Sequence, residues 1–133
     1  MNGFPRREIV EKIKEEYPSG TRIVLLSMRD VQAPPIGTKG TVEFVDDIGT
    51  IHPTWDTGDS LGIVYGEDSC RKTDPVKVTC YNKEEEWEDR MDAVAFYKEC
   101  MAGCDPSSSE YSRYRTINEQ LQRGLKEATD ETV

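Results

Sequence analysis

The feature that most constrains the fold is a series of short, β-branched apolar runs over residues 21–81, with turn residues between them. Five strands are predicted, at Arg22–Met28, Gly40–Asp46, Thr50–Trp55, Ser60–Tyr65 and Val76–Tyr81. Runs at this close spacing are typical of a small all-β barrel or sandwich. Pro53 cannot donate a ladder hydrogen bond, so the third strand should be bulged or lie at an edge. Ile51 and Trp55 share a strand parity and should face the core.

Helical periodicity comes before these strands. Ile9, Ile13 and Tyr17 repeat at helical spacing among charged residues, which predicts an amphipathic helix over residues 5–17. Pro18 and Gly20 should end it, because proline restricts the residue before it and glycine permits a turn. Residues 1–20 are therefore expected to form a helical segment ahead of a barrel that spans residues 21–81.

Helical periodicity returns after Tyr81. The charged run 83–90 leads into apolar positions that end at Gly103, which predicts one helix. Asp105 followed by Pro106 has the form of an N-cap with proline at the first helical position, and predicts a second helix that reaches Leu125. Residues 82–133 should form a helical hairpin with a short polar tail, 128–133, that frays. The predicted fold class is α+β.

Size and charge exclude several classes of protein. A chain of 133 residues has room for one domain, or a small domain with an appendage, and this excludes a multidomain enzyme. The formal charge of −9 disfavours non-specific binding to DNA or to an anionic membrane. No run approaches the roughly 20 apolar residues of a membrane span, and the first residues lack the apolar run of a secretion signal. A cytoplasmic location is expected.

Four stretches resemble a small uncharacterised domain family carried by bacterial phages and conjugative elements. They are Tyr17–Leu25, Pro35–Val42, Val45–His52 and Trp55–Leu61, and the likeness covers roughly residues 17–80. A later stretch, 96–104 and on through 111–124, resembles a C-terminal helical segment found in the same setting. The resemblance implies an SH3-like barrel with helices in an accessory protein of a mobile element. It implies no catalytic residue, because the family has no established activity.

The single histidine, His52, is the natural starting point for a catalytic site. Asp46, Asp47, Asp56 and Asp59 are near it in sequence, but no serine or cysteine nucleophile motif accompanies them. Aspartates in such turns are ordinary turn formers, and their spacing does not fit a calcium-binding loop. Phosphate-cradling glycine motifs are absent. We therefore expect no catalytic, cofactor-binding or metal site.

The four cysteines, Cys70, Cys80, Cys100 and Cys104, lack the paired spacing of a zinc finger or ribbon. Reduced thiols are expected. Cys100 and Cys104 share a helix face, which suits either two metal ligands or two small buried residues. A metal site built from all four cysteines stays open as an alternative.

The charge distribution marks a candidate binding surface. Residues 81–106 hold eight acidic and three basic residues. The acidic side chains around Trp87 are Glu84, Glu85, Glu86, Glu88, Asp89 and Asp92. They are explained either as a solvated helix N-terminus or as a surface that, with Asp46, Asp47, Asp56 and Asp59, presents phosphate-like charges to a basic groove on another protein.

A second candidate surface lies in the last predicted helix and its tail. Its residues are Arg113, Arg115, Arg123 and Lys126, interleaved with Tyr111 and Tyr114. Charge together with base stacking would suit local contact with nucleic acid. Glu110, Glu119 and Glu127 dilute this basic strip.

The functional hypothesis is a non-enzymatic accessory protein of a mobile element. It would inhibit a host defence nuclease, such as a CRISPR effector, by engaging the basic groove of that enzyme as an acidic mimic of nucleic acid. The first alternative is a nucleic-acid-binding accessory protein for phage or plasmid transfer, and the second is a cysteine-dependent or metal-dependent enzyme. The oligomeric state stays open, since Trp87, Tyr97 or Tyr111 could be buried against a second copy.

Overall fold

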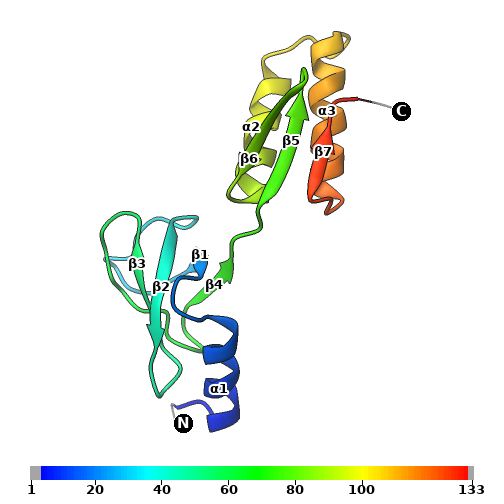
Figure 1. Cartoon of the computed structure of the whole chain (residues 1–133). Coiled ribbons are helices and arrows are strands. Elements are labelled where there is room, and N and C mark those ends of the chain that lie inside the picture. The colour runs from blue at the N-terminus through cyan, green and yellow to red at the C-terminus, as the bar shows by residue number, and fades with distance from the viewer. Residues whose placement is uncertain (1–3, 132–133) are drawn as a thin grey trace. The chain divides into compact units, whose positions relative to one another are not determined.

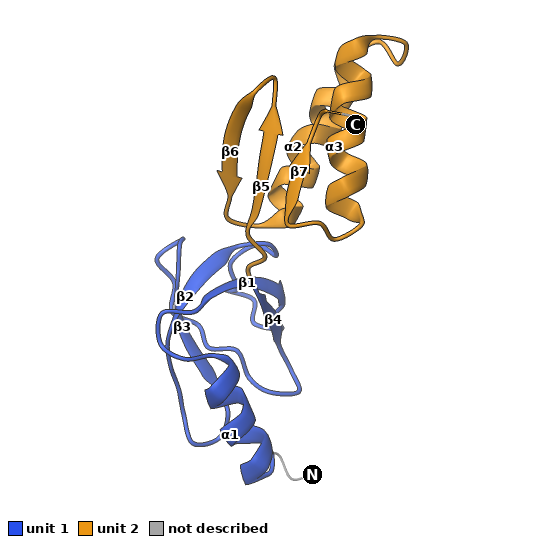
Figure 2. Cartoon of the chain, turned by 45° about the vertical axis from the view of Figure 1, so that its right-hand side comes forward, with its two compact units in different colours: residues 1–72 blue, residues 73–133 orange. Residues whose placement is uncertain are grey.

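The computed structural model describes residues 4–131, which form two compact units, residues 1–72 and residues 73–133 (Figure 2). The first unit contains α1 (Arg7–Glu16), β1 (Arg22–Ser27), β2 (Lys39–Val45), β3 (Ile51–Trp55) and β4 (Ser69–Lys72). The second contains β5 (Val76–Cys80), β6 (Lys83–Trp87), α2 (Arg90–Ala102), α3 (Ser109–Gln122) and β7 (Glu127–Thr129). Each unit has its own sheet (Figure 1), and the α+β class is confirmed.

The first sheet is antiparallel, in the order β3-β2-β1-β4, and does not close into the expected five-stranded barrel. The strand predicted at Ser60–Tyr65 is reduced to one bridge between Ile63 and Ile51. The Asp68 carboxylate accepts the Val64 N–H at 3.0 Å and curls this segment into a turn instead. The last strand of this sheet, β4, lies between the fourth and fifth predicted strands, where no strand is predicted.

The core of the first unit surrounds Trp55, which is 1% exposed. Ile51 and Trp55 both face this core, and Pro53 lies on an edge strand opposite Val42, as predicted. A Cβ on Gly40 would lie 2.7 Å from the Trp55 ring. Only glycine therefore lets β2 approach the indole this closely.

The predicted amphipathic helix is confirmed as α1, which ends at Tyr17. Val10 is buried, and Ile13 and Tyr17 pack against the core of the first unit. The Lys14 ammonium lies 2.8 Å from the Asp47 carboxylate and joins the helix to the turn between β2 and β3.

The strand predicted at Val76–Tyr81 is real, but it belongs to the second sheet rather than to the barrel. It pairs with β6, and the Cys80–Lys83 pair encloses a two-residue turn. Tyr81 and Asn82 in this turn have φ values of 51° and 64°. Two consecutive positive φ values match the right-handed twist of a tight hairpin, so the charged run after Tyr81 continues as a strand and not as a helix.

The second sheet has the order β6-β5-β7, and α2 and α3 cover one of its faces (Figure 2). The expected helical hairpin is present, and Gly103 follows α2 as predicted. The N-cap of α3 is Ser108 rather than Asp105, because the Asp105 carboxylate accepts the Ser107 N–H and forms a turn of its own. No helix among residues 4–131 is long and apolar enough to cross a bilayer.

The tail that was expected to fray forms β7, which pairs in parallel with β5. Ala128 is buried in the core of the second unit, and Asp130 is also buried. These two side chains fix the tail to the unit through residue 131, while residues 132–133 lie outside the described range.

Candidate binding surface of the second unit

The acidic residues of β6 are divided between the two faces of the second sheet. Successive side chains on a strand point to opposite faces. Glu85 pairs with Val78, which is buried against the helices, so Glu85 lies on the helix-covered side. Glu84 and Glu86 lie on the opposite side, which the helices leave uncovered, and both are exposed. The structure therefore separates residues that the sequence placed in one cluster.

The uncovered side, here called the open face, carries Glu84 and Glu86 from β6, Lys77 and Thr79 from β5, and Glu127 and Thr129 from β7. Lys77 stands opposite both Glu86 and Glu127, and its Nζ lies 3.8 Å from Glu84 Oε1. Three glutamates on two strands thus share one face with the lysine of the strand between them. The open face keeps an excess of negative charge.

A groove of about 570 Å³ lies at one end of the open face. Its lining residues are Pro75, Val76, Lys77, Glu86, Trp87, Glu88, Lys126 and Glu127. The groove thus combines three acidic and two basic residues with the ends of β5 and β6.

The spacing of the open-face carboxylates also suits the recognition of cations. Glu84 and Glu86 are two residues apart on a strand, which puts them about 6.6 Å apart along its axis. The two carboxylates therefore stand in a row on one face, as the phosphates of a nucleic-acid strand stand in a row along its backbone. The sheet fixes the backbone that carries them, so binding has to order only the side chains.

Asp89 and Asp92 do not belong to this surface. Asp89 is 2% exposed, and its carboxylate caps α2 by accepting the Met91 N–H. Asp92 is half-buried in the first turn of the same helix. The interpretation of the acidic cluster as a helix N-terminus is therefore right for these two residues and wrong for Glu84 and Glu86.

A network around Asp74 fixes the base of the second unit. Its carboxylate accepts hydrogen bonds from Lys126 Nζ and from Arg90 Nε, the latter at 2.7 Å. Arg90 also donates to the carbonyl oxygens of Leu121 at 2.7 Å and Leu125 at 2.8 Å, beside the end of α3. The Lys126 ammonium, and after it the Arg90 guanidinium, hold the pKa of Asp74 below its ordinary value. These contacts hold the start of β5, the start of α2 and the end of α3 together next to the groove.

The four candidate aspartates of the first unit all have partners within that unit. The Asp46 carboxylate accepts a hydrogen bond from His52 Nε2 at 2.8 Å, and Asp47 accepts one from Lys14 Nζ at 2.8 Å. Asp56 accepts from both terminal nitrogens of Arg22 at 2.8 Å, and Asp59 accepts from the Thr57 hydroxyl at 2.7 Å. Two of the four lie in the turn between β2 and β3 and two in the turn that follows β3.

His52 is held in place by its neighbours. The Phe44 ring stacks on the imidazole with centroids 4.5 Å apart, and Asp46 also accepts the N–H groups of Ile48 and Thr50. Burial acts to raise the pKa of Asp46, but the hydrogen bonds from His52 and from the two backbone groups hold it below its ordinary value. The described residues that line the groove beside His52 include no serine or cysteine. This arrangement supports the structural interpretation of His52.

The basic strip is largely neutralised. Arg113 lies 2.8 Å from the Asp130 carboxylate and 4.7 Å from the centre of the Tyr81 ring. Lys126 pairs with Asp74, Arg115 lies 3.8 Å from Glu119, and Arg123 follows α3 as its C-cap. Tyr114 packs against the core of the second unit, and both Tyr111 and Tyr114 are half-buried.

The cysteines are free thiols on both units. Cys70 belongs to the first unit, and Cys80, Cys100 and Cys104 belong to the second. Burial raises the pKa of Cys70 and that of Cys80 to about 11. Within residues 4–131, no group of three or more His, Cys, Asp or Glu side chains lies close enough to hold a metal ion.

Sequence reasoning missed Lys77, Thr79, Glu127 and Thr129 as members of the binding surface. The alternation of valine with polar residues over 76–79 is a signal for a sheet with one open face. Glu127 had no comparable signal, because β7 is three residues long and shows no period of its own.

Comparison with known protein families matches residues 6–73 to a domain of unknown function, DUF4314. The matched range ends next to the boundary of the first unit at residue 72. A search of curated proteins finds no match.

Proposed function

Since the chain belongs to the DUF4314 family, whose function is unknown, its role must be inferred from its own surfaces, and we propose that it is a non-enzymatic binding protein. Its open face binds a basic groove on another protein. The observation that supports this is the row of carboxylates from Glu84, Glu86 and Glu127 around the single ammonium of Lys77. The second unit as a whole carries fourteen acidic and eight basic residues.

The partner is a host protein that itself binds nucleic acid, with a defence nuclease such as a CRISPR effector as the leading case. A row of carboxylates competes for the groove that normally takes the nucleic-acid backbone. The resemblance of residues 17–80 to an uncharacterised domain family of phages and conjugative elements supports a mobile-element setting in the bacterial cytoplasm. An accessory protein of such an element has an evident use for blocking a nuclease.

Direct binding of nucleic acid by this chain has weaker support. Arg113, Arg115 and Lys126 each face a carboxylate of the same unit. Contact with phosphates would require these pairs to be broken against an overall negative charge. The basic strip is therefore the second candidate.

The test is a pull-down from a bacterial lysate in which Glu84, Glu86 and Glu127 are all changed to glutamine. Glutamine keeps the size and strand compatibility of the side chain and removes only the charge. Wild type should capture a basic nucleic-acid-binding protein after nuclease treatment, and a DNA oligonucleotide should elute it. The triple variant should lose that protein while its circular dichroism spectrum stays unchanged.

The matched control changes Glu15, Glu16 and Glu99 to glutamine. These residues are exposed near the ends of α1 and α2, so the net charge changes equally without touching the open face. Capture that survives in the triple open-face variant would contradict the proposal. Capture lost equally in both variants would show that only the net charge matters.

A further inference from the structure

A second cavity, of about 300 Å³, lies on the helix-covered side of the second unit, between β6, α2 and α3. It is separate from the groove on the open face. Aromatic rings line much of it, together with one carboxylate and one ammonium: Tyr81, Phe96, Tyr97 and Tyr114, with Glu85 and Lys83. We call it the aromatic pocket.

The aromatic rings of the pocket pack against one another. Phe96 meets Tyr97 edge to face, with centroids 5.0 Å apart and planes at 90°, and Tyr97 lies 6.0 Å from Tyr114. The centroid of the Trp87 ring lies 5.2 Å from that of Phe96 and 6.3 Å from that of Tyr97. Tyr97 is buried, whereas Phe96 is 43% exposed. The pocket therefore has a rigid inner wall and an accessible outer one.

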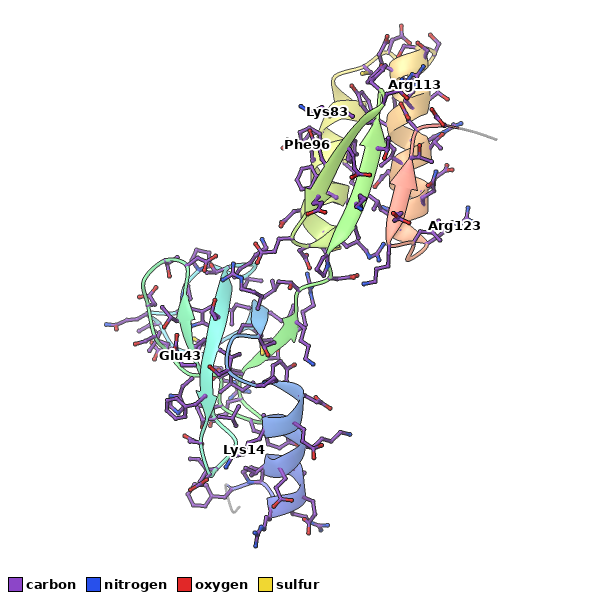
Figure 3. All side chains as sticks on the ribbon, in the orientation of Figure 1. Lys14, Glu43, Lys83, Phe96, Arg113 and Arg123 are labelled. Atoms are coloured by element: carbon purple, nitrogen blue, oxygen red, sulfur yellow. The ribbon has the colours of Figure 1, made fainter. Side chains whose placement is uncertain are left out.

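The lining of the aromatic pocket carries one carboxylate and one ammonium, which pair only loosely. The Glu85 side chain is 43% exposed, and its carboxylate lies 3.8 Å from the Lys83 ammonium. The Lys83 side chain is itself 79% exposed. Figure 3 shows Lys83 and Phe96 at the same edge of the second unit. A loosely held ammonium already stands beside the carboxylate, where a cation from outside could replace it.

We propose that the aromatic pocket receives one arginine side chain of the basic partner, with the guanidinium against the aromatic rings and hydrogen-bonded to Glu85. The negative face of an aromatic ring attracts a cation, and a planar guanidinium stacks on it while its N–H groups bind a carboxylate. Arg113 shows the same combination within this unit, since it lies over the Tyr81 ring and binds Asp130. The inference rests on the proposed function, because it assigns the side chain that the basic partner inserts.

Arginine fits the aromatic pocket better than lysine. An ammonium is a compact, strongly hydrated charge, whereas the guanidinium is planar and more weakly hydrated. A pocket that offers ring surface and a single carboxylate therefore binds a guanidinium more tightly than an ammonium. A hexa-arginine peptide should therefore bind more tightly than a hexa-lysine peptide of equal charge.

The experiment titrates the full chain with hexa-arginine at physiological ionic strength and compares F96L and E85Q with two controls. M91L and E99Q change exposed residues of α2 that do not line the pocket. F96L leaves every charge in place, so it separates the ring contact from general attraction. We expect F96L and E85Q each to weaken binding about 5-fold, or about 1 kcal/mol, and the controls to stay within roughly twofold of wild type.

A further variant tests the role of Lys83. K83S removes the ammonium that competes for Glu85 and should tighten binding of the peptide more than K98S, which removes an equal charge from an exposed site on α2. If K83S and K98S tighten binding of the peptide equally, Lys83 does not compete with the peptide for Glu85, and this part of the proposal is wrong.

Equal binding of hexa-arginine to wild type and F96L, or no binding to wild type, would overturn the pocket assignment. The proposed function is judged separately, by capture of the partner with the open-face variant. If only the open-face variant loses the partner, the open face is the contact surface and the pocket is not. If only F96L loses the partner, the aromatic pocket is the contact surface and the open face is not.

Discussion

The Asp89 carboxylate accepts a hydrogen bond from the backbone N–H of Asp74, 2.9 Å away and 15 residues earlier in the chain. Its second oxygen accepts the Met91 N–H at 3.1 Å. One buried side chain thus joins the residue that precedes β5 to the first turn of α2. Asp89 belongs by sequence to the acidic run around Trp87, but its role is structural.

Asp89→Ala should destabilise the second unit by about 2 kcal/mol, because it removes a helix N-cap and leaves two backbone N–H groups without their acceptor. Urea unfolding followed by the amide NMR signals of Val78 and Val94 measures this. Leu25 lies in the first unit and serves as the internal reference, whose unfolding should not change. Glu99→Ala, at an exposed position on the same helix, should cost less than about 0.5 kcal/mol. An Asp89→Ala variant as stable as this control would refute the capping role.

Acid should weaken the second unit through Asp130. Its buried carboxylate accepts the Tyr81 N–H at 2.9 Å and lies 2.8 Å from Arg113 Nη1. Burial acts to raise the pKa of Asp130, but these hydrogen bonds outweigh burial and hold the pKa below its ordinary value. A carboxylate with a lowered pKa stabilises the folded state above the unfolded pKa of about 3.9, and this stabilisation is lost as the pH falls through the folded pKa.

The measurement is urea unfolding of wild type and Asp130→Asn at a series of pH values from neutral to strongly acidic. Asp130→Asn should be less stable than wild type at neutral pH, and the difference should shrink below about pH 4. If the two proteins differ in free energy of unfolding by the same amount at every pH, the charge of the Asp130 carboxylate does not contribute to stability.

The sequence predicts α1 and the core of the first unit because local and tertiary preferences agree there. Ile9, Ile13 and Tyr17 follow a helical period, and the parity of Ile51 and Trp55 matches their burial. Where one hydrophobic periodicity dominates a segment, it predicts the helix or strand that the folded protein contains.

The second sheet could not be predicted for two physical reasons. Lys83–Trp87 is rich in glutamate, which favours helices, and only pairing with β5 makes it a strand. The turn before it uses Tyr81 and Asn82 at positive φ, where Asn-Gly would have been the recognisable signal. Because this turn gives no recognisable signal, the sequence predicts a helix where β6 lies. The open face of the second sheet is therefore not predicted.

Gly40→Ala should destabilise the first unit by roughly 1–3 kcal/mol, because its Cβ would overlap a packed ring. The added Cβ would lie 2.7 Å from Trp55 Cε3, which is shorter than ordinary van der Waals contact. Thermal unfolding followed by Trp55 fluorescence, in a background that carries Trp87→Phe, reports the change. Gly103→Ala is the control, since its Cβ would meet its nearest neighbours at 3.7 Å. Similar melting temperatures for the two variants would contradict the close approach.

Cys80 should resist alkylation in the folded protein. Burial, and after it the nearby Asp130 carboxylate, raise the pKa of this thiol to about 11. The thiolate is the reactive form, so its fraction at pH 8 should be roughly 200-fold below that of an ordinary thiol with a pKa near 8.5. Iodoacetamide labelling with mass spectrometry should show slow modification of Cys80 in native protein and fast modification in urea. Asp130→Asn removes one of the charges that raise the pKa and should speed native labelling, whereas rapid labelling of folded wild type would refute the burial of the thiol.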